Sequence, residues 1–153
     1  MIKLYIPRKR SLFSNQLELV NQEGHMVYRY HSNLFQTKRF IENSENEVIA
    51  NSYTDFGMIE QHVISQNNEI VAYVSYKSIW RNKILISKEG YSVKINNVMR
   101  FTIFNNLEEV LSIRRSDRKG FSCVVEVKEE QTDFLIILMF TILVMIEGLE
   151  VIY

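Results

Sequence analysis

The stretch Phe134-Leu-Ile-Ile-Leu-Met-Phe-Thr-Ile-Leu-Val-Met-Ile146 contains a single polar side chain, Thr141, among thirteen residues. A helix on the surface of a globular protein shows a polar face every 3.6 residues. Because this stretch has no such face, its surroundings must be apolar on all sides. Either the rest of the protein encloses it or it lies in a lipid bilayer.

The length and the flanks of this stretch favour enclosure. A bilayer core requires about twenty apolar residues, and thirteen residues give roughly 20 Å of helix against about 30 Å of hydrocarbon. No Lys or Arg follows Lys128 to anchor a membrane segment at the headgroups, and acidic residues flank the stretch. Gln131-Thr-Asp133 offers capping side chains, and Gly148 is placed to end a helix. We predict an enclosed helix near residues 131–148, and a C-terminal membrane anchor is the less favoured alternative.

Residues 2–128 alternate between apolar and polar side chains with a period of two. Phe121, Cys123 and Val125 share one face, for example, while Ser122 and Glu126 share the other. This alternation indicates half-buried strands, and clusters rich in Asn, Gly and Ser between the runs indicate turns. We predict about twelve strands, near residues 2–6, 15–20, 26–31, 37–42, 47–52, 60–65, 69–76, 82–88, 91–96, 99–104, 109–114 and 120–128.

The strands and the helix together predict the fold class. A closed barrel of about twelve strands has an interior too wide for its own side chains to fill, and a fully apolar helix supplies the missing volume. We therefore predict a mainly β (α+β) protein, a closed antiparallel barrel around a buried, fully apolar C-terminal helix. One proline and five glycines leave no obvious linker, so residues 1–153 form one domain.

This arrangement resembles the tubby C-terminal-like superfamily, which includes tubby proteins, phospholipid scramblases, LURP-one-related proteins and small bacterial proteins. The resemblance rests on the repeated hairpins, on the stretch from Phe101 to Ile113 and on the segment from Asp133 to Gly148. It covers nearly the whole chain and is strongest to the bacterial and LURP-one-related branch. The resemblance implies binding of phosphoinositides or other anionic lipids, with basic side chains holding the phosphates.

Two basic clusters in predicted loops are the candidate lipid-binding or anion-binding residues. Near an anionic surface, each basic side chain contributes about 1 kcal/mol. The alternative is that loop Lys and Arg side chains only keep the barrel solvated. The candidates are Arg8, Lys9 and Arg10 in the first cluster, and Arg114, Arg115, Arg118 and Lys119 in the second.

No segment of the chain indicates catalysis, a metal or a cofactor. The histidines His25, His31 and His62 share no metal-ligand spacing, so we expect them at the surface or on a sheet face. Cys123 alternates with apolar residues and is predicted to be a small core residue. The sequence contains neither a nucleophile elbow nor a glycine-rich phosphate loop. We therefore predict a non-enzymatic protein without a cofactor.

Aromatic and basic residues also lie close together in two places, where they could stack on nucleic acid bases. Sheet faces favour the same residues, and the chain has 18 basic and 18 acidic residues, so a nucleic acid partner is not expected. The first group is Tyr28, Arg29 and Tyr30, and the second is Tyr73, Tyr76, Lys77, Trp80 and Arg81.

The predicted function is that of a binding module for anionic phospholipid headgroups. A structural or protein-interaction domain without a small ligand is the alternative, and a small-molecule carrier is disfavoured because the helix would fill the lumen. A single cysteine and the short apolar start of the chain favour the cytoplasm over secretion. We therefore expect a cytoplasmic protein that is peripheral to the inner membrane face, with a lipid or a protein as its partner.

Overall fold

The computed structural model describes residues 1–8, 16–35, 37–58, 60–76, 83–97, 100–128 and 130–146. Twelve strands precede a single helix in these residues. The strands are β1 (Ile2–Pro7), β2 (Gln16–Val20), β3 (Met26–Ser32), β4 (Lys38–Asn43), β5 (Val48–Phe56), β6 (Glu60–Gln66), β7 (Glu69–Tyr76), β8 (Ile84–Ile86), β9 (Tyr91–Asn97), β10 (Arg100–Asn105), β11 (Glu108–Arg115) and β12 (Phe121–Val127), and the helix is α1 (Thr132–Ile146).

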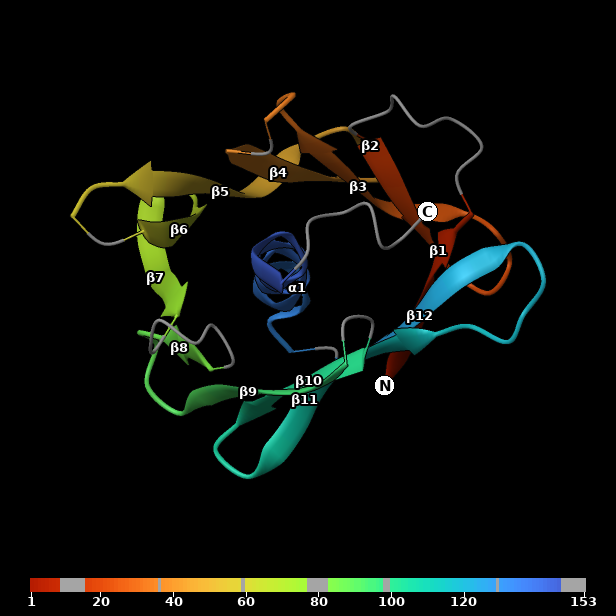
Figure 1. Ribbon diagram of the computed structural model, residues 1–153. Helices are drawn as coiled ribbons and strands as arrows, with labels where there is room; N and C mark the ends of the chain where they lie inside the picture. Colours follow the sequence, from red (N-terminus) through yellow and green to blue (C-terminus); the bar gives the residue numbers. More distant parts are fainter. Residues whose placement is uncertain are drawn as a thin grey trace.

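The strands form one antiparallel sheet that curls into a nearly closed barrel (Figure 1). Its order is β8-β7-β6-β5-β4-β3-β2-β1-β12-β11-β10-β9, so consecutive strands pair except β8 and β9, and β1 pairs with β12. The predicted antiparallel barrel with a C-terminal helix is confirmed in this form. Complete closure was wrong for the described residues, because β8 and β9 are the two edges of the sheet. Strand β8 is also shorter than the predicted run 82–88.

The up-and-down order of the strands gives the barrel two distinct ends. The connection from β12 to α1 and the turns that follow the even-numbered strands lie at one end, which we call the helix-start end. The turns that follow the odd-numbered strands lie at the other, the helix-finish end. The hydroxyl of Tyr76, the last residue of β7, donates a hydrogen bond to the Met145 carbonyl there, which places the end of α1 at this rim.

The helix α1 runs through the middle of the barrel (Figure 1). Each side chain from Phe134 to Leu143 is at most 2 % exposed. The Tyr30 ring stacks on the Phe140 ring with 4.3 Å between centroids. Cys123 is also buried in this core, as its alternation with apolar residues predicted.

The start of α1 differs in detail from its predicted capping. The helix begins at Thr132, and Leu135 N donates to the Gln131 carbonyl at 3.0 Å. The Asp133 carboxylate lies in the first helical turn, where it accepts a hydrogen bond from the Tyr28 hydroxyl. A negative charge at this position is favourable for the helix dipole. The predicted terminal glycine, Gly148, lies outside the described residues.

Among the described residues, no helix combines the length and the apolar character needed to cross a membrane.

Candidate functional site

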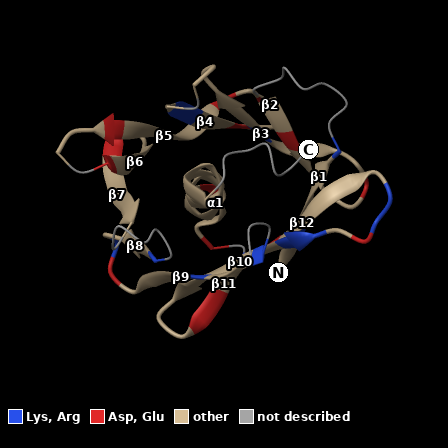
Figure 2. Ribbon diagram, viewed as in Figure 1, with Lys and Arg blue, Asp and Glu red and all other residues tan. Residues whose placement is uncertain are grey.

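The structure brings Arg8 of the first predicted basic cluster beside the second cluster at the helix-finish end. Arg8 N donates to the Gly120 carbonyl at 3.0 Å, and Pro7 pairs with Phe121 in the β1–β12 ladder. The end of β1 therefore lies beside the turn between β11 and β12, which carries the second cluster. Lys9 and Arg10 follow Arg8 directly in sequence but lie outside the described residues. Figure 2 shows the basic positions on the β11–β12 turn.

The side chains of the second cluster lie in different environments. Arg114 points to the outer wall, where its Nη2 lies 3.5 Å from Glu126 Oε1, so that carboxylate offsets its charge. The Arg118 guanidinium lies over two rings, 5.2 Å from the Tyr5 centroid and 4.9 Å from the Phe121 centroid. This contact holds the side chain while leaving its charge at the surface.

Arg115 and Lys119 are the remaining members of the cluster, and both are exposed. Arg115 is the last residue of β11, and Lys119 lies in the turn that follows. With Arg8, they are the cations of the described cluster that are best placed to meet an anion from solution. Asp117 lies in the same turn and reduces the local positive charge.

Charge is separated between the two ends of the barrel, although the whole chain is neutral. Basic residues outnumber acidic ones in the described turns and adjoining strand residues of the helix-finish end, and the reverse holds at the helix-start end. The helix-finish end carries Arg8, Lys38, Lys83, Arg100, Arg115 and Lys119 against Asp55, Glu60 and Asp117, while the Arg118 guanidinium reaches the Gln22 carbonyl of the β2–β3 turn at 3.5 Å. The helix-start end carries Glu23, Glu45, Glu47, Glu69, Glu89, Glu108, Glu130 and Asp133 against Lys88 and Lys128.

A buried polar cluster lies inside the barrel, next to the helix. Arg39 is 0 % exposed, and its Nε donates to Ser52 Oγ at 2.7 Å. Its Nη1 donates to Thr54 Oγ1 at 3.1 Å, and its Nη2 lies 3.2 Å from His62 Nδ1. The Thr141 hydroxyl of α1 donates to Ser52 Oγ at 3.1 Å, so the cluster connects three strands to the helix.

The contacts of His62 determine its protonation. A guanidinium only donates hydrogen bonds, so His62 Nδ1 accepts and the neutral ring carries its proton on Nε2. Burial, assisted by the positive charge of Arg39, lowers the pKa of His62 to about 4. Burial also lowers the pKa of Arg39 to about 10. At neutral pH the cluster therefore holds a charged arginine and a neutral histidine.

His62 lies on a sheet face, one of the two expected positions, and Arg39 was missed. His62 is 3 % exposed on the inner face of the barrel, not at the surface. The signal was present in the alternation, because Arg39 shares its face with Ile41 and His62 shares its face with Ile64. Their proximity could not be read from the sequence, because it depends on the register of β4, β5 and β6.

A cavity of about 230 Å³ opens between the polar cluster and the helix-finish end. Thr54 and His62 line its inner part, and the aromatic side chains of Phe35 and Phe56 lie around it. The last turns of α1 contribute Val144 and Met145. The cavity thus joins a polar interior to apolar side chains at the rim.

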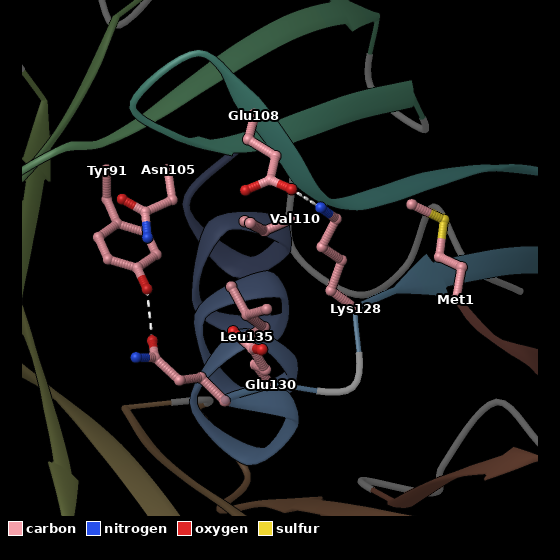
Figure 3. Close-up of a pocket in the computed structure, with 9 residues that line it drawn as sticks. Met1, Tyr91, Asn105, Glu108, Val110, Lys128, Glu130 and Leu135 are labelled. Carbon is pink, nitrogen blue, oxygen red and sulfur yellow. Dashed lines mark hydrogen bonds and ion pairs between the residues drawn. The ribbon is translucent and has the colours of Figure 1, made fainter.

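A larger cavity, of about 610 Å³, lies at the helix-start end (Figure 3). Lys128 forms an ion pair with Glu108 at its edge, and the Tyr91 hydroxyl donates to Gln131 Oε1. Burial raises the pKa of Tyr91. Burial, together with the Asp133 carboxylate, raises the pKa of the neighbouring Tyr28 well above its usual value. Both phenols are therefore neutral at physiological pH and act only as hydrogen-bonding groups.

No metal centre accompanies these cavities in the described part of the chain, where no group of three His, Cys, Asp or Glu side chains could hold an ion. Cys123 is buried, and burial raises the pKa of its thiol to about 11. The thiol is thus protonated at neutral pH, and protonated thiols are poor nucleophiles.

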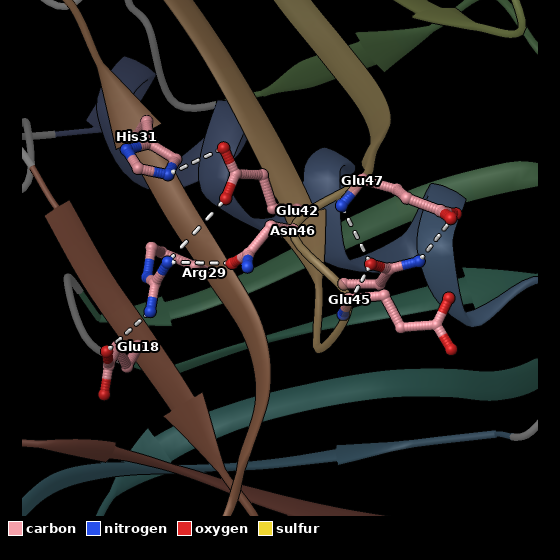
Figure 4. Close-up of polar contacts among 8 residues, drawn as sticks. Glu18, Arg29, His31, Glu42, Glu45, Asn46 and Glu47 are labelled. Carbon is pink, nitrogen blue, oxygen red and sulfur yellow. Dashed lines mark hydrogen bonds and ion pairs between the residues drawn. The ribbon is translucent and has the colours of Figure 1, made fainter.

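The outer wall over β2, β3 and β4 carries an ion-pair network (Figure 4). The Arg29 guanidinium lies 3.4 Å from Glu18 Oε1 and 3.8 Å from Glu42 Oε2, and His31 Nε2 lies 3.2 Å from Glu42 Oε1. The tyrosines that flank Arg29 in sequence, Tyr28 and Tyr30, are buried inside the barrel.

Those two tyrosines therefore cannot serve as a base-stacking surface with Arg29. In the second aromatic group, Tyr73 faces outward and Tyr76 is tied to the helix end. Lys77, Trp80 and Arg81 lie outside the described residues.

Comparison with known proteins identifies the fold. No protein-family model matches this chain, and no curated protein matches it either. The chain is similar in fold to a plant protein of known structure. That X-ray structure, of a protein from Arabidopsis thaliana, superposes with a TM-score of 0.60 over 94% of this chain and 88% of the plant chain. At 12% sequence identity the similarity concerns the fold alone.

Proposed function

We propose that this protein is a non-enzymatic module that binds anionic phospholipid headgroups through the basic residues of its helix-finish end. The observation that carries the proposal is the hydrogen bond from Arg8 N to the Gly120 carbonyl, 3.0 Å long. It places the start of the Arg8-Lys9-Arg10 run beside the turn that carries Arg115, Arg118 and Lys119. Arg8 and the second cluster, more than a hundred residues apart in sequence, thereby share one basic surface.

The chemistry of binding follows from the donors on this surface. Guanidinium and ammonium groups donate to phosphate oxygens, and each basic residue contributes about 1 kcal/mol near an anionic membrane. Arg115 and Lys119 are free to approach phosphates, whereas Arg114 already lies beside Glu126. An anionic membrane repels the acidic helix-start end, so the molecule should approach with its basic helix-finish end toward the membrane.

Three further expectations belong to this proposal. The chain is a member of the tubby C-terminal-like superfamily, in which a basic surface for anionic lipids has a precedent. Its apolar C-terminal helix is the core on which the barrel folds. The protein works in the cytoplasm, peripheral to the inner membrane face.

Co-sedimentation with vesicles tests the proposal. The protein should bind vesicles of phosphatidylserine and phosphatidylcholine but not phosphatidylcholine alone, and rising salt should weaken binding because it screens exposed charges. The double variant Arg115→Glu/Lys119→Glu should bind several-fold more weakly. Lys94→Glu is the control, because Lys94 is exposed on the barrel wall away from both ends. Equal binding by wild type and the double variant would overturn the assignment of this surface.

A protein-interaction domain without a small ligand is the second candidate. A row of exposed apolar side chains on the outer wall of β5, β7 and β8 favours it. Tyr53 and Tyr73 both pair with Val63 of β6, and Leu85 lies nearby on β8. A folded protein that ignores anionic vesicles at low salt would support this candidate over lipid binding.

A further inference from the structure

Two turns at the helix-finish end present apolar side chains directly to solvent. In the β3–β4 turn, Leu34 is 75% and Phe35 is 81% exposed. At the β5–β6 turn, Phe56, the last residue of β5, is 68% exposed, and Met58 within the turn is 106% exposed. Single exposed apolar residues are normal on protein surfaces, but a group of large ones marks an interaction site. We call these four side chains the apolar tips.

The apolar tips form one group because the two turns are neighbours. Thr54 N donates to the Thr37 carbonyl at 2.8 Å, which joins β5 to the end of the β3–β4 turn. Phe35 and Phe56 then lie around the same cavity of about 230 Å³. The two turns therefore present apolar side chains at the same rim of the barrel, around a cavity that Thr54, Glu60 and His62 also line.

Side-chain hydrogen bonds fix the backbone of both turns. Asn33 Oδ1 accepts from Thr37 N at 2.7 Å and from Lys38 N at 3.1 Å. In the other turn, Asp55 Oδ1 accepts from Gly57 N at 3.1 Å. The apolar tips take no part in these bonds, so they are free to contact a partner. Because these bonds hold the described turn residues in place, binding through them costs little conformational entropy.

The charges around the apolar tips indicate which partner they contact. The tips share the helix-finish end with the basic surface; Lys38 follows the first turn, Asp55 and Glu60 flank the second, and most other acidic turn residues lie at the opposite end. An anionic bilayer complements both features, because its headgroups meet the cations and its acyl region accepts the apolar side chains. The acidic end carries exposed apolar side chains as well, with Leu107 98% exposed in the β10–β11 turn, Met1 65%, Val48 57% and Ile70 52% exposed.

We propose that the apolar tips insert into the acyl region of an anionic bilayer once the basic surface has met the headgroups. This inference rests on the proposed lipid-binding function and adds a second contribution to it. Charge attraction is screened by salt, whereas burial of apolar side chains is not. Part of the binding should therefore survive in high salt once the tips have inserted.

The first test compares an environment-sensitive fluorophore at the two ends of the barrel. The label NBD is attached to Met58→Cys and, as a matched control, to Leu107→Cys, since Cys123 is buried. With vesicles of phosphatidylserine and phosphatidylcholine, the M58C label should shift to the blue and be quenched by brominated acyl chains. The L107C label should do neither. Vesicle binding without a response at M58C, or with a response only at L107C, would overturn the proposal.

The second test removes the apolar tips without changing charge. The variant Leu34→Ser/Phe35→Ser/Phe56→Ser/Met58→Ser should bind anionic vesicles about tenfold or more weakly, given the transfer free energy of such side chains. Leu107→Ser should bind like the wild type. Unchanged binding by the fourfold variant, while Arg115→Glu/Lys119→Glu still weakens binding, would reject insertion but keep headgroup recognition. If neither variant bound anionic vesicles more weakly than the wild type, both insertion and headgroup recognition would be rejected.

Self-association is the competing use of the same surface. Sedimentation equilibrium without lipid should give the mass of a monomer for the wild type and for the fourfold variant. A wild-type dimer that becomes monomeric in the fourfold variant would overturn insertion, because a second copy would then be the partner of the apolar tips.

Discussion

Arg39 Nη2 lies 3.2 Å from His62 Nδ1 inside the barrel, where burial and the neighbouring guanidinium together keep the imidazole neutral. Ser52 and Thr54 accept hydrogen bonds from the arginine, and Thr141 of the helix contacts Ser52. Polar groups buried in this way stabilise a fold only while their hydrogen bonds are intact. The contact therefore makes the stability of the barrel depend on both pH and side-chain identity.

Stability should fall as the pH decreases from about 6.5 to about 4. The pKa of His62 is about 4 in the folded protein and 6.5 in the unfolded chain. In this window the unfolded chain binds a proton that the folded protein does not, so acid favours unfolding. The effect is about 3 kcal/mol at most. Urea denaturation across this range checks it, and His62→Gln should show a smaller slope; an identical slope in the variant would contradict this account.

Replacing Arg39 should destabilise the protein strongly. In Arg39→Met, the hydroxyls of Ser52 and Thr54 and the His62 ring lose a buried partner, and such losses cost about 3 kcal/mol or more. Arg114→Met is the control, because its partly exposed ion pair with Glu126 should contribute less than about 1 kcal/mol. Chemical denaturation compares the two. Similar midpoints for both variants would show that the buried cluster contributes little.

Two glycines with similar backbone angles allow a matched test of one turn contact. Gly90 has φ +87 and Gly24 has φ +86, so alanine is strained at either position. At Gly90 the new methyl group would also lie 2.9 Å from Asn106 Oδ1, while at Gly24 nothing lies within 4 Å. Gly90→Ala should lower the melting temperature more than Gly24→Ala, by a free energy of about 1 kcal/mol beyond the shared strain. Equal losses would show that Asn106 moves aside freely.

Deleting residues 131–153 should abolish cooperative folding. The strands bury their inner side chains against α1, and an empty barrel interior would cost far more than the marginal stability of a domain. Circular dichroism and thermal denaturation of the truncated chain provide the check. A truncated chain that stays soluble and melts cooperatively would show that the helix is not the core.

Local patterns in the sequence were sufficient to predict the strands. A period of two and turn-forming residues are short-range properties, so the predicted runs fall within a few residues of the observed strands. Asn46, Asn67, Asn68 and Asn106 adopt positive φ at the tight turns, which asparagine tolerates better than most residues. The helix followed from its unbroken apolar composition, which needs no knowledge of the partner strands.

The site was less predictable because it depends on pairings across long stretches of chain. The basic clusters were found individually, but their union requires the β1–β12 ladder, which joins Ile2 to Val127. The Arg39–His62 contact similarly depends on two strand registers. The charge separation between the barrel ends follows from the alternation of turns, yet it becomes visible only when every turn is assigned to an end.

The β1–β12 ladder also sets the order of events during synthesis. Ile2 finds its partner only when Val127 has left the ribosome, and α1 follows still later. Early hairpins can form as they emerge, but β1 gains its β12 partner only when β12 has emerged. Folding therefore has a high contact order and is completed only once β12 and α1 have emerged. Until then the unpaired edge of β1 can pair with strands of other chains. This is the edge that chaperones of nascent chains most need to shield.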